Sequence, residues 1–336
     1  MKQILVTRPA RRLSRAVVGG GVLAACLVFG GSANAGLIFT FDYSGNTPDV
    51  GFLDPVQGAA RRAALDTSGN LFSSLFGGYF TQMGVINMSV TSIVNPTGTT
   101  LASAFSNFVN VPGSFGAGEV IRNKLITGND LNGSVLDGGV DVNWGYDWEL
   151  DPNTPAVGPG PGQTYDFYAA LFHEFTHALG FGSEISGDPA GDRFGQGGEG
   201  SGSPGSWAKW DQFISTCTMA TPLVDGASYE VNDAAVADAW ANGGCFGGAN
   251  ALAANGGPVQ LFANPDQSHL DNGTFPTAMM KPDRDYGPQE ARDYNGAEIG
   301  ILTDLGYTRQ RVVPEPTSIV LLLAGLVGLA VRRRKV

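Results

Sequence analysis

Basic residues are scarce in the central part of the sequence. Of the 20 lysines and arginines, five lie before residue 36 and four lie after residue 312, whereas only Glu315 of the 31 acidic residues lies outside this region. Residues 36–312 therefore hold 11 basic and 30 acidic side chains, a net charge near -19. A protein that binds nucleic acid needs a basic face, so this balance excludes nucleic acid as a partner.

Cysteine is also rare, with only Cys26, Cys217 and Cys245 in 336 residues. No cysteine lies between Gly36 and residue 173, so a propeptide cysteine that blocks a metal site is excluded. The 49 glycines and the 15% share of charged residues indicate ordered loops rather than a helical bundle. Residues 36–312 are numerous enough for one sizeable core or two lobes.

The first 35 residues have the order of a secretory signal peptide. Five basic residues come first, an apolar run follows over residues 16–30, and the segment closes on Ala33-Asn34-Ala35. This order predicts export, with Gly36 as the first residue of the mature protein. Cys26 follows Leu-Ala-Ala, so lipoprotein processing at this cysteine is the alternative.

The C-terminus carries a second signal. Val313-Pro314-Glu315-Pro316 precedes an apolar stretch over residues 318–331 and the basic cluster Arg332-Arg333-Arg334-Lys335. The stretch is short for a bilayer span of about 20 residues, and the basic cluster would stay cytoplasmic. Residues 313–336 resemble the PEP-CTERM sorting signal of Gram-negative bacteria. The resemblance implies transient anchoring in the inner membrane by a short transmembrane helix, removal by a sorting transpeptidase, and release to the cell surface or extracellular matrix. A permanent tail anchor is the alternative.

The central region alternates between strand-like and helix-like patterns. The expected strands are 37–41, 85–94 and 140–144, and the expected helices are 56–76, 166–179, 232–241 and 290–305. Gly180 stands where a left-handed cap would end the second helix. We expect an α+β fold with a small mixed sheet and the 166–179 helix in an N-terminal lobe (36–182), followed by a loop-rich C-terminal lobe (183–312).

The 166–179 helix contains His173-Glu174-Phe175-Thr176-His177. Residues four apart lie on one helical face, so His173 and His177 can bind one metal ion. Glu174 lies beside them and can act as general base. Zinc at such a site lowers the pKa of a bound water and polarises a substrate carbonyl. The pattern predicts a zinc hydrolase, and coincidental histidines on an exposed helix are the alternative.

The sequence from His173 to Phe181 resembles the metzincin metalloproteases, in which a third histidine follows the helix closely. That position is Ser183 here, a departure from the family pattern. The remaining histidine, His269, precedes a methionine pair and is similar in placement to the late third ligand of the leishmanolysin-like branch. The later segments Trp207–Phe213 and Asp304–Tyr307 extend this resemblance to about residues 160–310. The resemblance implies a zincin-like protease with His269 as the third zinc ligand.

Several roles around this predicted site have more than one candidate. A methionine turn beneath the metal is expected at Met279 or Met280, with Met279 preferred, and core packing is the alternative for both. An oxyanion donor could be Tyr286 or Tyr294. The carboxylates that could replace His269 as the third ligand are Asp188, Glu199 and Asp211.

Two features bear on stability outside the helix. Cys217 and Cys245 remain after export into an oxidising compartment, which predicts a disulfide between them, with two free thiols as the alternative. A calcium site just before the helix is weighed against a solvated acidic loop, because the carboxylate spacing fits no EF-hand. The residues concerned are Asp137, Asp141, Asp147, Glu149 and Asp151.

The sequence as a whole predicts an exported zinc metalloendopeptidase that cleaves peptide bonds of extracytoplasmic proteins. Two alternatives stay open. One is a cell-surface or biofilm-matrix protein that uses a zincin scaffold without catalysis, for which Glu174 would have no purpose. The other is a zinc amidase that acts on cell-wall peptide.

Overall fold

The structure is a computed structural model that describes residues 36–79, 84–185, 204–218, 221–263, 267–288 and 292–308. All of these residues belong to one compact unit, Asn34–Val336. The predicted signal peptide and the predicted sorting signal lie outside the described residues, as do the possible ligands Asp188 and Glu199. The division into lobes at residue 182 stays a prediction.

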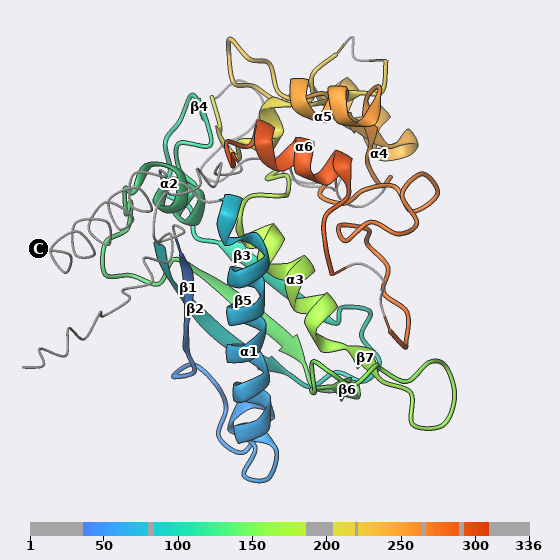
Figure 1. Ribbon diagram of the computed structural model, residues 1–336. Helices are drawn as coiled ribbons and strands as arrows, with labels where there is room; N and C mark the ends of the chain where they lie inside the picture. Colours follow the sequence, from blue (N-terminus) through green and yellow to red (C-terminus); the bar gives the residue numbers. More distant parts are fainter. Residues whose placement is uncertain are drawn as a thin grey trace, which may run out of the picture. The chain divides into compact units, whose positions relative to one another are not determined.

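The described residues form a mixed α/β structure with small sheets and six α-helices (Figure 1). The strands are β1 (Leu37–Asp42), β2 (Gly84–Ile93), β3 (Ala102–Ser106), β4 (Ser114–Phe115), β5 (Gly138–Asn143), β6 (Trp148–Glu149), β7 (Tyr165–Asp166), β8 (Ser206–Trp207), β9 (Ile214–Thr216), β10 (Gly244–Phe246) and β11 (Val259–Gln260). The helices are α1 (Gly58–Phe76), α2 (Val120–Thr127), α3 (Phe167–Ala178), α4 (Asp233–Asn242), α5 (Ala249–Asn255) and α6 (Gly296–Asp304). Short 3₁₀ turns are η1 (Gly51–Leu53), η2 (Gly77–Tyr79) and η3 (Trp210–Gln212).

The largest sheet has four strands in the order β1-β2-β5-β3. β1, β2 and β5 run parallel, whereas β3 pairs with β5 in the antiparallel direction, from Ala102 opposite Val142 to Ser106 opposite Gly138. The sheet is therefore mixed. β3 lies at its edge, where main-chain groups are available for a further strand.

Helices α1 and α3 pack on the same face of this sheet (Figure 1). The contact is aromatic: Phe175 of α3 stacks on Phe39 of β1 with ring centroids 4.5 Å apart, and its ring meets that of Phe72 of α1 at 5.5 Å. Phe175 and Phe72 are fully buried. Such rings bury a large apolar area and lock relative orientations, so this cluster fixes α3 on the sheet.

The second half of the chain contains the three-stranded sheet β11-β10-β9 and the helices α4, α5 and α6, which lie together (Figure 1). Cys217 follows β9 and forms a disulfide with Cys245 of β10. Helices α5 and α6 approach closely at Gly300, because a Cβ there would lie 2.7 Å from the Cα of Ala251. The side chain of Asp304 accepts hydrogen bonds from the main-chain N–H groups of Asn250 and Ala251, which ties the two helices together.

Most expected elements agree with the structure to within about two residues at each end, which is the usual uncertainty of boundaries. The expected helix 290–305 is the exception, since it starts at Gly296. Asn295 caps it and exchanges hydrogen bonds with Glu298 in a capping box, which fixes the first turn there. The strand β3 had no clear sequence signal, although it borders the site described next.

Candidate metal centre and cleft

Helix α3 is fixed at both ends by local chemistry. The side chain of Asp166 caps the first turn by accepting a hydrogen bond from Ala169 N at 3.0 Å. The Arg292 guanidinium binds both oxygens of this carboxylate, at 2.7 and 2.9 Å. Beyond the last turn Gly180 has φ +95°, a left-handed conformation that favours glycine. The helix therefore starts and stops where its sequence predicts.

The structure brings the three histidines of the chain together. The Nε2 atoms of His173 and His177 are 3.0 Å apart, and each lies 3.1 Å from Nε2 of His269. His173 is 5% exposed, and the other two are half-buried. Among the described residues these three form the one group of histidine, cysteine or carboxylate side chains that could hold a metal ion.

The hydrogen bonds of two histidines fix which ring nitrogen carries the proton. His177 Nδ1 lies 2.7 Å from Phe181 O, and His173 Nδ1 lies 2.7 Å from Met279 O. A carbonyl oxygen only accepts, so both Nδ1 atoms carry the proton and both Nε2 atoms present lone pairs. Burial, followed by the neighbouring His177, Arg284 and His269, holds the pKa of His173 well below its ordinary value.

This donor set fits a metal ion. Lone pairs that face each other across 3.0 Å repel, and a shared cation would turn this repulsion into attraction. Zinc lies about 2.0–2.1 Å from imidazole nitrogen, so two tetrahedral ligands stand roughly 3.3 Å apart, close to the observed spacing. Imidazole nitrogens suit zinc, and three protein ligands leave a position open as in catalytic sites.

Glu174 lies beside the histidines and is 9% exposed. Burial raises its pKa to about 8, whereas the charge of Arg284 and a hydrogen bond from the Ala104 main chain lower it. Ala104 belongs to the edge strand β3, so the strand and the carboxylate are in direct contact. The arrangement places a candidate proton acceptor between the three histidines and the sheet edge.

The methionine pair reaches the site through its main chain. Met279 O accepts the hydrogen bond from His173, and Met280 N donates to Glu298 Oε1 at 2.7 Å. Both methionine side chains are fully buried in the core. Glu298 is also fully buried, and burial raises its pKa to about 7 while the hydrogen bonds from Asn295 and Met280 lower it. Glu298 was not among the predicted site residues, because glutamate in a helix usually faces solvent, although the Asn295-to-Glu298 spacing is that of a capping box.

Arg284 is a second functional candidate that the sequence did not reveal. Its Nη2 donates to Met279 O, the same carbonyl that accepts from His173, and it lies 3.0 Å from His173 Nδ1. Arginine only donates and His173 Nδ1 already carries a proton, so these two nitrogens do not bond to each other. They lie close together because both donate to Met279 O. Arg284 Nε and Nη1 are buried without a hydrogen-bond partner. Burial lowers the pKa of Arg284, whereas Glu174, Glu298 and Asp166 raise it.

A cleft of about 1000 Å³ contains the site. Its walls include all three histidines and Glu174, the residues 99–106 that contain β3, and the turn 182–184 after α3. Both charge signs occur along it: Lys281 and Arg284 are basic, and Glu119, Glu184, Asp283 and Asp285 are acidic. A polar cleft with an exposed sheet edge suits an extended polar chain.

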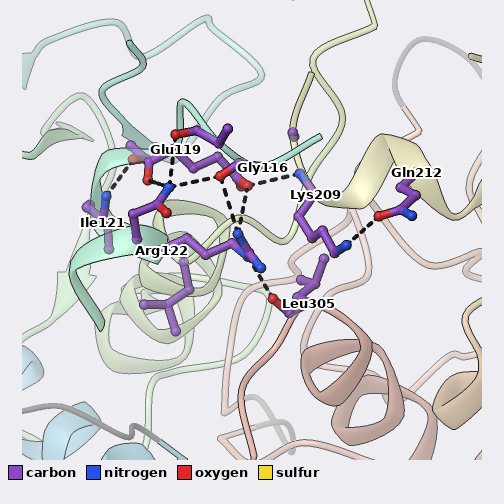
Figure 2. Close-up of polar contacts among 12 residues, drawn as sticks. Gly116, Glu119, Ile121, Arg122, Lys209, Gln212 and Leu305 are labelled. Carbon is purple, nitrogen blue, oxygen red and sulfur yellow. Dashed lines mark hydrogen bonds and ion pairs between the residues drawn. The ribbon is translucent and has the colours of Figure 1, made fainter. Parts of the chain in front are cut away.

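Figure 2 shows the polar contacts around Glu119 and Arg122. Glu119, which is 2% exposed, accepts a hydrogen bond from Lys209 N at 2.9 Å and lies 3.8 Å from Arg122 Nη1. Arg122 Nε donates to Leu305 O at 2.6 Å, so the cluster joins α2 to the end of α6. A Cβ at Gly180 would lie 2.5 Å from Glu119 Oε1, so only glycine fits against this carboxylate. Burial raises the pKa of Glu119 to about 7, against the lowering effect of Arg122.

The other candidate side chains have contacts of their own. Asp211 is fully buried and accepts hydrogen bonds from Ser183 Oγ and from the main chain, so both of its oxygens are engaged. Tyr294 is buried with its hydroxyl 2.7 Å from Thr176 Oγ1, behind α3. Tyr286 stacks at 4.0 Å on Tyr165, a residue of the cleft wall.

The acidic residues weighed for calcium do not gather at one point. Asp137 is fully buried and binds Lys124 Nζ with both oxygens at 3.0 Å. Asp141 accepts from Ser103 Oγ, and Asp151 accepts from Asn153 N and Thr154 Oγ1 in its own turn. Calcium binding in this loop stays a prediction, without support from these positions.

Comparisons with known proteins bear on the C-terminus. Residues 312–335 match the family model of the PEP-CTERM protein-sorting motif. The match confirms the sorting signal and supports an exported protein that a sorting system recognises and that is anchored at the membrane through its C-terminus. No curated protein and no solved structure matches the chain. Within the described residues no helix is long and apolar enough to span a bilayer; the apolar run 318–331 is outside them.

Proposed function

We propose that this protein is an exported zinc-dependent metalloendopeptidase with a zincin-like active site. His173, His177 and His269 would hold the zinc ion, and Glu174 would be the general base. The observation that carries the proposal is the meeting of three Nε2 atoms at 3.0–3.1 Å beside a buried carboxylate, in a cleft bordered by an edge strand.

Each part of the site would have its own role in peptide hydrolysis. When bound, zinc would polarise the scissile carbonyl and acidify a water molecule. Glu174 takes the proton of the attacking water and passes it to the leaving amine. The Ala104 N–H orients this carboxylate, and β3 offers its edge to an extended peptide, which favours a peptide substrate over a small molecule.

The test is zinc analysis and casein cleavage with purified wild type, Glu174→Gln and Glu149→Gln. Glu149 lies on β6 outside the cleft wall, so its variant is the matched control. We expect stoichiometric zinc in all three proteins, and cleavage reduced about 10²- to 10⁴-fold in Glu174→Gln alone. Equal cleavage by Glu174→Gln and wild type would refute the enzymatic proposal and favour the non-catalytic surface protein.

The sorting signal adds a proposed route. We propose that the C-terminal tail anchors the protein transiently in the inner membrane of a Gram-negative bacterium, and that a sorting transpeptidase then removes it for display at the cell surface or in the matrix. Mass spectrometry of the protein recovered from the matrix tests this route. Intact residues 313–336 on the mature protein would contradict removal and favour the permanent anchor.

A further inference from the structure

The third histidine comes from a segment that is bound chiefly to its own half of the chain. Phe262 N donates to His269 O at 2.9 Å, and Leu270 N donates to Met280 O at 2.8 Å. These bonds fix the backbone around His269 relative to β11 and the methionine pair. The methionine pair in turn reaches helix α3, because Met279 O accepts a hydrogen bond from His173 Nδ1 at 2.7 Å.

A second connection between α3 and the His269 segment passes through the turn that follows the helix. Ser183 N donates to Ser268 Oγ at 3.0 Å, next to the third histidine. Gly182 packs into the same gap, because a Cβ there would lie 3.4 Å from Ser268 Oγ and 3.7 Å from His177 Nδ1. The turn is therefore in contact with a helix histidine on one side and with the segment of His269 on the other.

Ser183 is itself held in place by a buried carboxylate. Its Oγ donates to Asp211 Oδ1 at 2.6 Å and accepts from Ile185 N at 3.1 Å. Asp211 Oδ2 accepts from Ala208 N at 3.0 Å and from Glu184 N at 3.2 Å. A buried carboxylate is strongly disfavoured unless its oxygens are bonded, so these contacts make Asp211 a rigid anchor.

The segment that carries Asp211 is fixed on two further sides. Trp210 Nε1 donates to Gln267 O at 3.0 Å, so the residues that hold Ser183 also hold the chain just before Ser268. On the opposite side Lys209 N donates to Glu119, as Figure 2 shows. The fully buried Trp210 thus links the anchor and the histidine segment as one body.

We propose that Ser183 is a positioning residue for the third histidine: anchored by Asp211, it holds Ser268 and so sets the His269 imidazole against the two helix histidines. The inference rests on the metal-site part of the proposed function. Groups that orient metal ligands affect metal affinity by about 10- to 100-fold. Loss of the Ser183 or Ser268 contact should therefore weaken metal binding although every ligand remains.

The experiment measures zinc affinity by chelator competition, and the visible spectrum of the cobalt form, for Ser183→Ala and Ser268→Ala. Ser92→Ala is the matched control, since Ser92 Oγ accepts from Phe52 N at 2.9 Å on a part of the sheet outside the cleft wall. We expect affinity to fall about 10- to 100-fold in both test variants and to stay unchanged in the control. Metal-free unfolding temperatures should fall by similar amounts in all three.

The decisive comparison repeats the two substitutions in a His269→Ala background. A positioning residue has nothing left to position there, so Ser183→Ala and Ser268→Ala should cause no further loss of zinc affinity. Equal losses in both backgrounds would show a general effect on the fold and overturn the inference. Unchanged affinity in the wild-type background would overturn it as well, while zinc binding and Glu174-dependent cleavage by wild type would leave the proposed function standing. Wild type that binds no zinc would refute both.

Discussion

Replacement of His269 by alanine tests the long-range part of the metal site. The three Nε2 atoms are nearly equidistant, at 3.0, 3.1 and 3.1 Å, so each histidine should contribute similarly to binding. Four-ligand zinc sites bind with about 10–16 kcal/mol, roughly 3 kcal/mol per ligand, which corresponds to about 100-fold in affinity. We therefore expect His269→Ala to bind zinc about 100-fold more weakly than wild type.

The assay is zinc per protein after equilibration with a buffered zinc series, read by elemental analysis. Asn272→Ala is the control, because Asn272 also lines the cleft but its side chain donates to Asp283. Wild-type zinc affinity in His269→Ala would refute the three-histidine site. It would place the third ligand on a carboxylate such as Asp188 or Glu199, because both oxygens of Asp211 are already engaged.

Three further predictions concern an aromatic core residue, the disulfide and a buried carboxyl group. Phe175→Ala should lower the free energy of unfolding by about 3–5 kcal/mol, because its ring is buried against Phe39; a loss below about 1 kcal/mol in denaturant titration would contradict the packing. Replacing both Cys217 and Cys245 by serine should lower the free energy of unfolding by about 3–4 kcal/mol through loop entropy. Equal unfolding of the wild-type protein with and without reductant would contradict this. Burial raises the pKa of Glu119 from 4.5 to about 7. The protonated Glu119 carboxyl therefore stabilises the fold below pH 4.5, and this stabilisation is lost as the pH rises through about 7. Glu119→Gln should remove up to about 3 kcal/mol of this pH dependence, read as melting temperatures at pH 5 and pH 7.5.

The parts of the fold that the sequence predicts are those with local causes. The two histidines four residues apart, the capping Asp166 and the left-handed Gly180 all act within helix α3 and its next turn, and the structure has this helix at Phe167–Ala178. By contrast, β3 is five residues of small and mixed side chains. Its strand character comes from pairing with β5, which no local pattern encodes.

The charged residues that surround the site were hidden for a different reason. Glu119, Glu298 and Arg284 look like ordinary surface residues in the sequence, since such side chains are seldom fully buried. Their surroundings come from distant parts of the chain: Glu119 accepts from Lys209 N, 90 residues away, and Arg284 lies against His173, 111 residues away. A sequence pattern gives residue types and short spacings, so it can find the histidines but not the charged side chains that the fold brings around them.

The methionine pair shows how a sequence signal can find a site without revealing its chemistry. A choice between Met279 and Met280 as the residue beneath the metal assumes that a side chain makes the contact. In the structure both side chains fill the core, and the contacts come from the main chain: Met279 O binds His173, Met280 N binds Glu298, and Met280 O binds Leu270 N. The side chains therefore hold the turn in the core, while its backbone orients His173 and the segment that carries His269. Another side chain that packs equally well at position 279 or 280 could preserve the site, because the site depends on the backbone conformation of this turn and not on the methionine side chains.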